Sequence, residues 1–317
     1  MRTKLIGLIT AIAALSQASA ARADDVLKLA IGQRGNWDTS ISELGQRQGI
    51  FAKHGLKLDI IYTQGTGETL QATIAGSVDI GVAIGTLGAL GAFSKGAPIR
   101  AIGSASTGAS DLFWYVPADS PIKTFSDANG KNVAISTNGS STHTVLLGLE
   151  RHYGVKVKTV PSGSPSPTFT VVMSGQVDVG WSSPPFALDA LAQKKIRIVA
   201  RGSEVAELGD QTVRLLVVNA AVLETKKALL QRYMAAYRET LDWLYGDPAG
   251  LKAYSEWTGI PEELTRQLPI DFYPKAMMRP ERVSGIDKIM ADAVTFKYLS
   301  APLPEDKLRG FFQIVKD

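Results

Sequence analysis

Short blocks of apolar and polar residues alternate along the first part of the chain, and they predict strands and helices in turn. Residues 26–31 alternate into an apolar run that ends at Gly32, which predicts a buried strand. Ser40 and Glu43 have the spacing of a capping box, so we expect a helix from there through Phe51 that stops at Gly55. The same reading predicts strands at 56–62, 78–84 and 99–103 and helices at 69–75 and 87–94. Strict alternation of strand and helix is typical of an α/β domain with a parallel sheet.

An aromatic run at 112–116 breaks this rhythm, and we expect it to be the first crossover strand into a second lobe. The alternation then starts again, and residues 213–218 are expected to return the chain to the first lobe. The elements predicted for the second lobe are strands at 133–136, 155–160, 177–181 and 196–200, and helices at 141–153, up to Met173 and at 186–193. Beyond Leu223 the pattern is mostly helical, at 223–245, 281–298 and 304–315, and we expect this region to pack back on the first lobe.

The two halves of the chain share a pattern at a fixed offset of 99 residues. The pairs that keep this offset are Gly55 and Gly154, Lys57 and Lys156, Gly76 and Gly175, Asp79 and Asp178, and Gly81 and Gly180. Five matches in register predict two lobes built on one supersecondary plan, and two such lobes are expected to face each other across a ligand. Asp79 and Asp178 precede their strands on the side away from the cleft, so we expect them to be structural rather than catalytic.

Residues 1–23 have the pattern of a secretory signal peptide. Arg2 and Lys4 precede an apolar run at 5–15, and small residues then lead to an expected cleavage before Asp24. A membrane anchor is less favoured, because the run is shorter than the roughly 20 apolar residues that span a bilayer. The chain has no cysteine, which excludes disulfides and a lipidated-cysteine anchor. We therefore expect a freely soluble periplasmic protein.

Charge and histidine content narrow the choice of partner. The chain has 34 basic and 30 acidic residues, and three of the basic ones lie in the expected signal peptide, which leaves 31 against 30. No basic stripe interleaved with aromatic residues is present, so a nucleic-acid partner is not expected. The three histidines, His54, His143 and His152, have no metal-ligand spacing, and we expect neither a metal nor a cofactor.

Three stretches of the chain carry a resemblance to a known family: LQATIAGSVDIGVAIGTLGALGAFSKGAPIRAIGSAS, VPADSPIKTFSDANGKNVAIS and VMSGQVDVGWSSPPFALDAL. They resemble the nitrate/sulfonate/taurine-type periplasmic substrate-binding proteins of ABC importers, over nearly all of the mature chain. The resemblance implies the type II periplasmic-binding-protein-like α/β fold, with two lobes joined by two crossover strands. It further implies a small-molecule ligand, delivery to a permease and ATPase complex at the inner membrane, and a monomeric protein.

This fold and the alternation of elements divide the chain into expected domains. Lobe 1 is discontinuous and comprises 24–111 and 215–317, whereas lobe 2 comprises 112–214. Closure over the ligand is expected to be a hinge motion at about 111–116 and 211–217.

In open parallel sheets a ligand lies beyond the carboxyl ends of the strands, where loops lead into helices. The first such loop in lobe 1 contains Gln33, Arg34, Asn36 and Trp37. Arg34 can pair with an anion and Trp37 offers a flat stacking face, although a surface charge and ordinary core packing are the alternatives. Thr66, in the glycine loop that follows the next strand, joins these candidates.

The corresponding loop of lobe 2 is rich in hydroxyl and amide side chains. Its candidates are Asn138, Gly139, Ser140, Ser141 and Thr142, directly before a predicted helix. Unpaired N–H groups and the helix dipole favour an oxyanion such as a carboxylate or sulfonate at this position. Capping of the helix is the alternative role, and it needs only one or two of these residues.

Further candidates follow the repeated strands and the crossovers: Gly85, Thr86, Thr107, Trp181, Ser182, Ser183 and Arg214. We expect Trp181 to stack on the ligand opposite Trp37, with interior packing as its alternative. Arg214 is expected to act either as an anion clamp or as an ion pair that bridges the lobes.

The sequence therefore predicts a solute-binding protein for a small organic anion, either a sulfonate or a carboxylate. Gly139-Ser140 and Gly163-Ser164 only weakly mimic a nucleophile elbow, so an enzyme is not expected. Two alternatives stay open. In the first, the ligand is a heteroaromatic such as a thiamine-type pyrimidine. In the second, the protein senses a ligand for a signalling partner instead of delivering it to a transporter.

Overall fold

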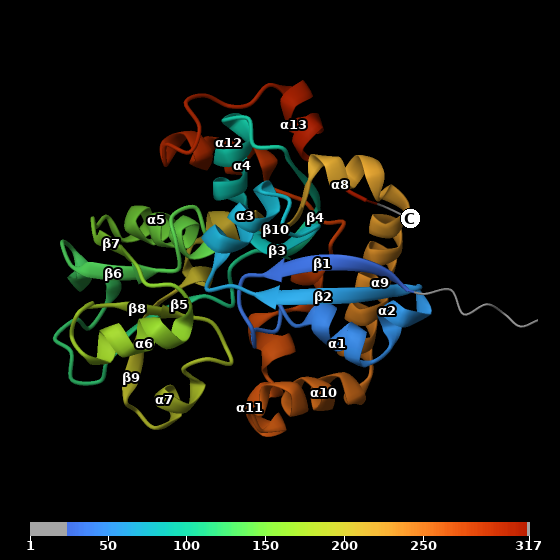
Figure 1. Cartoon of the computed structure of the whole chain (residues 1–317). Coiled ribbons are helices and arrows are strands. Elements are labelled where there is room, and N and C mark those ends of the chain that lie inside the picture. Colours follow the sequence, from blue (N-terminus) through green and yellow to red (C-terminus); the bar gives the residue numbers. More distant parts are fainter. Residues whose placement is uncertain (1–23, 316–317) are drawn as a thin grey trace, which may run out of the picture.

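Two α/β lobes lie side by side in the computed structural model, which describes residues 24–315 (Figure 1). The expected signal peptide at 1–23 lies outside the described residues. The strands are β1 Asp25–Ile31, β2 Leu56–Tyr62, β3 Ile80–Gly85, β4 Ile99–Thr107, β5 Phe113–Pro117, β6 Asn132–Ile135, β7 Lys158–Pro161, β8 Gly180–Ser182, β9 Ile196–Arg201 and β10 Thr212–Asn219. The α-helices are α1 Ile41–Arg47, α2 Ile50–Lys53, α3 Thr66–Ile74, α4 Thr86–Ser94, α5 Ser141–Tyr153, α6 Pro165–Met173, α7 Leu188–Ala192, α8 Ala220–Thr225, α9 Lys227–Gly246, α10 Pro248–Thr258, α11 Glu262–Thr265, α12 Ile286–Thr295 and α13 Glu305–Phe311.

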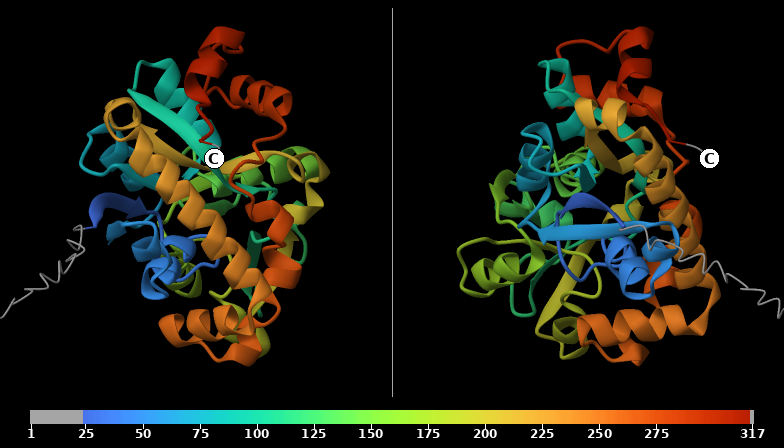
Figure 2. Two further views of the ribbon diagram at one scale, coloured as in Figure 1. Left: turned by 90° about the vertical axis from the view of Figure 1, so that its right-hand side faces the viewer. Right: turned by 45° about the vertical axis from the view of Figure 1, so that its right-hand side comes forward.

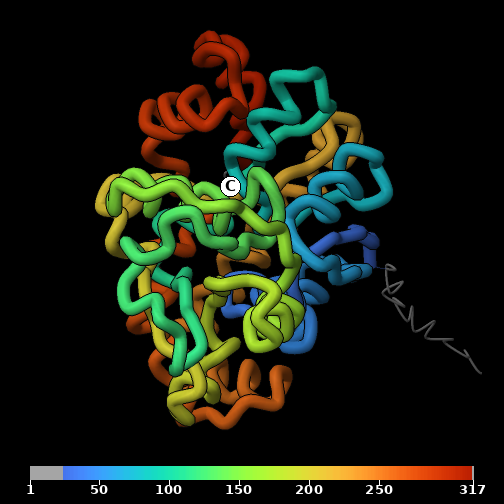
Figure 3. Tube along the Cα trace, turned by 90° about the vertical axis from the view of Figure 1, so that its left-hand side faces the viewer, coloured from blue at the N-terminus to red at the C-terminus, as the bar shows by residue number. Residues whose placement is uncertain are grey.

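The sheet of lobe 1 has the strand order β2-β1-β3-β10-β4. β1 runs parallel to β2 and β3, whereas β10 runs antiparallel to both β3 and β4. The strand that returns from lobe 2 is thus inserted between two strands of the first half of the chain. Figure 3 shows the consequence, with the green-to-yellow trace of lobe 2 in front of blue and red parts of lobe 1 that come from opposite ends of the chain.

Lobe 2 repeats this plan on a smaller scale. Its strands form an antiparallel group, β8-β5-β9, and a parallel pair, β6-β7, and an isolated bridge between Val133 and Val179 joins β6 to the start of β8. The resulting order, β7-β6-β8-β5-β9, matches that of lobe 1 strand for strand, with β5 in the place of β10. The fold is therefore the α/β fold of periplasmic binding proteins that the sequence predicted.

The repeated aspartates make equivalent hydrogen bonds in the two lobes. Asp79 Oδ2 accepts a hydrogen bond from the backbone N–H of Lys28, at 2.9 Å, and Asp178 Oδ2 accepts one from that of Asn132, at 2.8 Å. In lobe 1 the carboxylate joins the turn before β3 to β1, and in lobe 2 it joins the turn before β8 to β6. Both residues therefore have the structural role that the sequence predicted.

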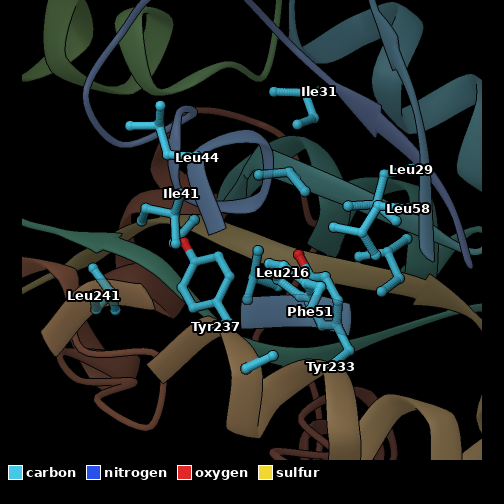
Figure 4. Close-up of a cluster of buried hydrophobic side chains, with 14 of the residues drawn as sticks. Leu29, Ile31, Ile41, Leu44, Phe51, Leu58, Leu216, Tyr233, Tyr237 and Leu241 are labelled. Atoms are coloured by element: carbon cyan, nitrogen blue, oxygen red, sulfur yellow. The ribbon is translucent and has the colours of Figure 1, made fainter. Parts of the chain in front are cut away.

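The sheet of lobe 1 is covered on both faces. One core lies between the sheet and helices α1, α2, α9 and α10, and Figure 4 shows Tyr233 and Tyr237 of α9 close to Leu216 of β10. Figure 2 shows the long helix α9 running across the molecule. The other core contains residues of α4, α12 and α13, and the C-terminal helices lie beside α4 (Figure 1). The C-terminal third of the chain thus completes lobe 1.

The two crossings between the lobes lie next to each other. The chain leaves lobe 1 after Thr107 and returns at Thr212, and the hydroxyls of these two threonines are 2.9 Å apart. The N–H of Gly108 donates to the carbonyl of Gln211 at 2.8 Å. β5 and β10 are each paired on both sides, so the connections outside the sheets lie before them, at 108–112 and 202–211.

Several predicted elements differ from the structure. The helix expected at 223–245 is α8 followed by α9, the helix expected at 281–298 is the shorter α12, and the strand expected at 155–160 begins at Lys158. The helix expected through Phe51 is two short helices, because Gly49 between them has a φ of +77°, in the left-handed region. The expected capping box is also not formed, since Ser40 Oγ donates to the carbonyl of Trp37 and Glu43 instead pairs with Arg47. Within residues 24–315, no helix is long and apolar enough to cross a membrane.

Candidate ligand-binding site

A cavity of about 50 Å³ lies between the two lobes. A buried water needs about 10–15 Å³ of such space, so this cavity has room for a few waters or a small polar head group. It lies where the carboxyl ends of strands from both sheets meet, as expected for this class of fold. The lining residues are Gly32, Gln33, Asn36, Asp38, Thr39, Gly65, Thr66, Ala83, Ser136, Ser140, Ser141, Thr142, Trp181, Ser183 and Arg214.

Two helices begin at this cavity, one from each lobe. α3 begins at Thr66 and α5 begins at Ser141, and both residues line the cavity. The first N–H groups of a helix have no acceptor within the helix, and the helix dipole makes this end electropositive. The cavity therefore has an electropositive pole to which both lobes contribute.

The hydroxyls of the lobe 2 loop mainly stabilise the loop itself. Ser140 caps α5, because its Oγ accepts from the N–H of His143 at 3.2 Å. Thr142 Oγ1 accepts from the N–H of Ser136 at 2.8 Å, and Ser141 Oγ accepts from Arg214 Nε at 2.9 Å. The hydroxyls are thus engaged within the loop and with Arg214, and the N–H groups of Ser141 and Thr142, in the first turn of α5, have no acceptor within the helix.

Arg214 is the centre of a buried ion-pair cluster. Its Nη2 is 2.8 Å from Asp111 Oδ2, and its Nη1 is 3.2 Å from Asp38 Oδ2. Burial alone would lower the pKa of Arg214, but the two carboxylates hold that pKa above its usual value. With Ser141 as its third partner, Arg214 joins β10 to the first turn of α5. Both ion pairs lie within lobe 1 and its crossing, and the contact that bridges the lobes is the hydrogen bond to Ser141. The role of Arg214 as an anion clamp stays a prediction.

Asp38 is the acidic group of the cavity wall. Its side chain is 3% exposed, and its Oδ1 has no hydrogen-bond partner. Burial raises the pKa of Asp38 to about 6, against the attraction of Arg214, and the charge of Asp111 adds to the rise. The sequence analysis missed this residue, although it lies in the same loop as the candidates around Asn36.

Three more buried polar atoms of the cavity residues have no partner. They are Nε2 of Gln33, Oδ1 of Asn36 and Nε1 of Trp181. The other side-chain atom of Asn36, Nδ2, donates to Ser183 Oγ across the two lobes. Buried polar atoms are nearly always hydrogen-bonded in folded proteins, so the gathering of four unpaired ones, with Asp38 Oδ1, makes this cavity the candidate ligand site.

Two residues of the first loop do not reach the cavity. Trp37 is fully buried in the core of lobe 1, where its Nε1 donates to Tyr245 Oη at 2.8 Å and its ring packs 4.8 Å from that of Tyr254. The expected stacking of Trp37 on a ligand is therefore wrong. Arg34 lies against α10, where it donates to the carbonyl of Trp257 and covers its ring at 4.8 Å.

Other candidates contribute to contacts around the cavity instead of its wall. Thr86 Oγ1 donates to the carbonyl of Thr212 at 2.6 Å, and Thr107 Oγ1 pairs with the hydroxyl of the same residue. Ser182 Oγ donates to the carbonyl of Phe186 at 3.2 Å. Asn138 is exposed.

Gly85 and Gly139 form a tight contact between the lobes. A Cβ added at Gly85 would lie 2.3 Å from the carbonyl oxygen of Gly139, and that oxygen accepts from the N–H of Gly88. Both glycines were expected to bind ligand, but they instead allow the two lobes to meet. Of the predicted residues, the cavity wall contains Gln33, Asn36, Thr66, Ser140, Ser141, Thr142, Trp181, Ser183 and Arg214.

Comparisons with known proteins agree with this picture. A putative aliphatic sulfonates-binding protein of Escherichia coli (strain K12) is 27% identical over 174 residues, which are 54% of this chain and 53% of that protein. The chain thus matches about half the length of this curated relative. The alkanesulfonate-binding protein SsuA from Xanthomonas axonopodis pv. citri, bound to MOPS, has a TM-score of 0.72 at 20% identity over 89% of this chain and 96% of its own.

The same fold also occurs in an enzyme. The desulfurization enzyme DSZB has a TM-score of 0.60 at 17% identity, over 89% of this chain and 95% of its own. At such low identity these structures show the fold and leave the activity open. The family described as NMT1/THI5 like matches residues 42–250, more than half of the chain. The resemblance seen in the sequence is thus confirmed, and the chain belongs to the NMT1/THI5-like family.

Proposed function

We propose that this protein is the solute-binding component of an ABC importer and captures a small organic anion, a sulfonate or a carboxylate, between its lobes. The observation that carries this proposal is the convergence of the α3 and α5 N-termini on one buried cavity from opposite lobes. An anion at this position takes hydrogen bonds from backbone N–H groups of both lobes and so favours the closed arrangement. The sulfonate-binding relatives support the choice of ligand class.

Side-chain donors complete the anion site. Trp181 Nε1 and Gln33 Nε2 are buried donors without partners, on opposite lobes. Neutral donors stabilise an oxyanion without adding a formal charge to a buried site. Trp181 thus serves in this proposal as a donor, and with Trp37 in the core no aromatic sandwich remains to favour the heteroaromatic alternative.

Binding rather than catalysis fits the way the reactive side chains are used. The hydroxyls of Ser140, Ser141 and Thr142 are engaged in the loop and in the Arg214 contact. His143 Nδ1 lies 2.5 Å from Tyr298 Oη, outside the cavity wall, and burial lowers the pKa of this histidine. These contacts therefore do not pair any of the three hydroxyls with a general base, as a nucleophile would require.

We place the protein in the periplasm as a monomer, with residues 1–23 as its export signal and a permease with its ATPase as its partner. The expected division, with lobe 1 at 24–111 and 215–317 and lobe 2 at 112–214, cuts through β10. Because β10 begins at Thr212 in the sheet of lobe 1, we place the return to lobe 1 at Thr212. Hinge closure would use the connections outside the sheets, at 108–112 and 202–211. The expected hinge segments, 111–116 and 211–217, fall mostly on the paired strands β5 and β10. A sensing role without a transporter remains the second candidate, and a permease and ATPase encoded nearby would decide against it.

The test is a thermal-shift panel on protein beginning at Asp24, with alkyl and aryl sulfonates, aliphatic and aromatic carboxylates, nitrate and thiamine-related pyrimidines. A ligand at a hundred times its Kd adds about 2.7 kcal/mol, which raises the melting temperature by several degrees. A rise with sulfonates or carboxylates supports the proposal. A rise only with neutral heterocycles overturns it. If no compound acts, mass spectrometry of the denatured protein identifies a retained solute, and a non-anionic solute likewise overturns it.

A further inference from the structure

His143 joins a residue of lobe 1 to the loop that leads into α5. Its Nδ1 lies 2.5 Å from Oη of Tyr298, which follows α12 in lobe 1, and 3.2 Å from the backbone nitrogen of Gly139. The ring of Tyr298 also packs on this glycine, because a Cβ added at Gly139 would lie 3.3 Å from Tyr298 Cε1. One ring nitrogen thus contacts both lobes, beside the place where Gly85 and Gly139 meet.

The contacts of this nitrogen favour the neutral imidazole. A backbone N–H can only donate, so the N–H of Gly139 needs His143 Nδ1 as an acceptor without a proton. Burial raises the pKa of Tyr298 to about 12, so its hydroxyl keeps its proton in acid and donates to the same nitrogen. If His143 is protonated, the hydroxyl of Tyr298 can turn and accept, but the N–H of Gly139 then faces a second donor. Protonation therefore weakens this joint between the lobes.

The surroundings of His143 do not stabilise a positive charge on it. α4 and β6, which pack against α5, contain no charged or titratable side chain. The charged or titratable residues on the other packed elements are Lys297 and Tyr298 after α12, Arg214 in β10 and Glu204 after β9, and those on α5 itself, about two turns or more away, are Glu150, Arg151, His152 and Tyr153.

The groups of opposite charge on these elements are engaged elsewhere. Glu204 accepts from Tyr153 Oη at 2.5 Å at the far end of α5, and Glu150 accepts from the N–H of Val157 at 2.8 Å. Burial alone lowers the pKa of His143 below its ordinary value of 6.5. No carboxylate in the described part of the chain therefore holds this imidazole in its protonated form.

We propose, on the basis of the proposed function, that His143 is a pH-sensitive latch, which holds the lobes closed over the ligand when it is neutral and weakens their closure when it is protonated. In the closed arrangement the ring of Tyr298 packs edge-on against the imidazole, at 6.0 Å between ring centres, and helps to bury it. Separation of the lobes removes this cover, so the open protein takes up the proton more readily. Closure then releases a proton in acid, and ligand affinity falls as the pH falls.

Attraction between a protonated His143 and the bound anion is the rival effect. His143 is the third residue of α5, so a positive charge there adds to the electropositive end of the helix. In that case an anion binds more tightly as the pH falls. The two effects have opposite signs, so the dependence of affinity on pH distinguishes them.

The first experiment measures the Kd of propane-1-sulfonate at pH 7.5 and pH 5.0 by titration calorimetry, for wild type, His143→Asn and His152→Asn. The Oδ1 of an asparagine takes the place of Nδ1 as an acceptor and does not titrate. His152→Asn is the matched control, because His152 is exposed on the same helix. Asp38, with a pKa of about 6, titrates in all three proteins, so its effect cancels in the comparison.

We expect wild type and His152→Asn to lose at least fivefold more affinity between the two pH values than His143→Asn does. One pKa unit corresponds to a factor of ten in an equilibrium constant, so a fivefold change needs less than one unit. An equal or smaller loss in wild type than in His143→Asn overturns the latch and leaves the proposed function intact. If no sulfonate or carboxylate binds at either pH, the proposed function fails and the inference fails with it.

A second measurement does not depend on the variant. The pKa of His143 in wild type is measured by nuclear magnetic resonance from its Cε1–H signal, with and without saturating propane-1-sulfonate. We expect a lower pKa in the complex, because closure buries the imidazole under Tyr298. An equal or higher pKa in the complex overturns the latch.

Discussion

Arg214 Nε donates to Ser141 Oγ at 2.9 Å, and this hydrogen bond joins β10, the returning strand of lobe 1, to the first turn of α5 in lobe 2. The same guanidinium is paired with Asp38, before α1, and with Asp111, in the crossing before β5. Three segments that are far apart in the sequence are thus fixed relative to one another by one side chain. The electropositive end of α5 is positioned by this cluster.

We expect Arg214→Met to destabilise the protein strongly, because it leaves two buried carboxylates without their cation. Breaking a buried ion pair by removing one partner costs about 3–5 kcal/mol. The free energy of unfolding, measured by urea denaturation at pH 7, should fall by that amount. Replacing the charges together, as Arg214→Met with Asp38→Asn and Asp111→Asn, should recover most of the loss. A triple variant as unstable as the single one would show that the charges are not the cause.

Asp38 should make the stability of the ligand-free protein depend on pH in an unusual direction. Its pKa rises from 3.8 to about 6 on folding, mainly through burial, so the folded protein binds this proton more tightly than the unfolded chain. The stability that this group contributes is complete below pH 3.8 and is lost as the pH rises through about 6. One pKa unit corresponds to about 1.4 kcal/mol, so the loss amounts to about 3 kcal/mol.

The comparison of wild type with Asp38→Asn isolates this contribution from that of the other carboxylates. The variant should gain about 2.4 kcal/mol relative to wild type between pH 4 and pH 7, by urea denaturation at each pH, because the rest of the change lies outside this range. The charged groups that face Asp38 are Arg214 and Asp111, and both are present in the two proteins. Parallel stability curves over this range would show that Asp38 is ionised as easily in the folded as in the unfolded state.

The contact between Gly85 and Gly139 should control closure of the lobes. Gly85 has an ordinary φ of −60°, so Gly85→Ala brings no backbone strain, but its Cβ would lie 2.3 Å from the carbonyl oxygen of Gly139. We expect the variant to fold with its lobes further apart, and solution scattering should give a larger radius of gyration. Gly246→Ala is the control, because a Cβ there meets no atom within 4 Å. Equal radii for all three proteins would contradict a steric role for Gly85.

Sequence patterns predicted those features of the fold that depend on local signals or on repetition. α5 was expected at 141–153 and occupies Ser141–Tyr153, because Ser140 caps its start and Gly154, with a φ of +66°, ends it. The 99-residue repeat predicted two similar sheets, and corresponding aspartates hold corresponding strands. Capping residues lie within a few residues of the helix they define, and a repeat is visible by comparing the chain with itself. Both kinds of signal can therefore be read from one sequence.

The remaining features depend on contacts between distant positions. Arg214 lies 176 residues from Asp38 and 103 residues from Asp111. No sequence motif near any of the three residues predicts that they form one cluster. Trp37 lies in a loop that does form the site, but its ring packs toward α9 and α10, and only their placement decides this. The sequence thus predicted which loops form the site, but it did not predict which side chains of those loops point into the cavity.

The role of backbone N–H groups in anion binding can be separated from that of the side chains at Ser141. Proline is tolerated at the first position of a helix and removes the N–H there. The preceding residue, Ser140, already has the extended conformation that a following proline requires, with φ −70° and ψ 167°. Ser141→Ala is the matched control, because it also loses the hydroxyl that accepts from Arg214 but keeps the N–H.

We expect Ser141→Pro to bind propane-1-sulfonate and 2-aminoethanesulfonate at least tenfold more weakly than Ser141→Ala does, by titration calorimetry. A hydrogen bond to a charged group contributes about 1.5–3 kcal/mol, and each 1.4 kcal/mol is tenfold in Kd. Both ligands should be affected alike, because the N–H lies at the pole that binds the sulfonate. Equal affinities of the proline and alanine variants would remove the N–H of Ser141 from the anion site. A loss confined to 2-aminoethanesulfonate would show that this N–H does not bind the sulfonate group.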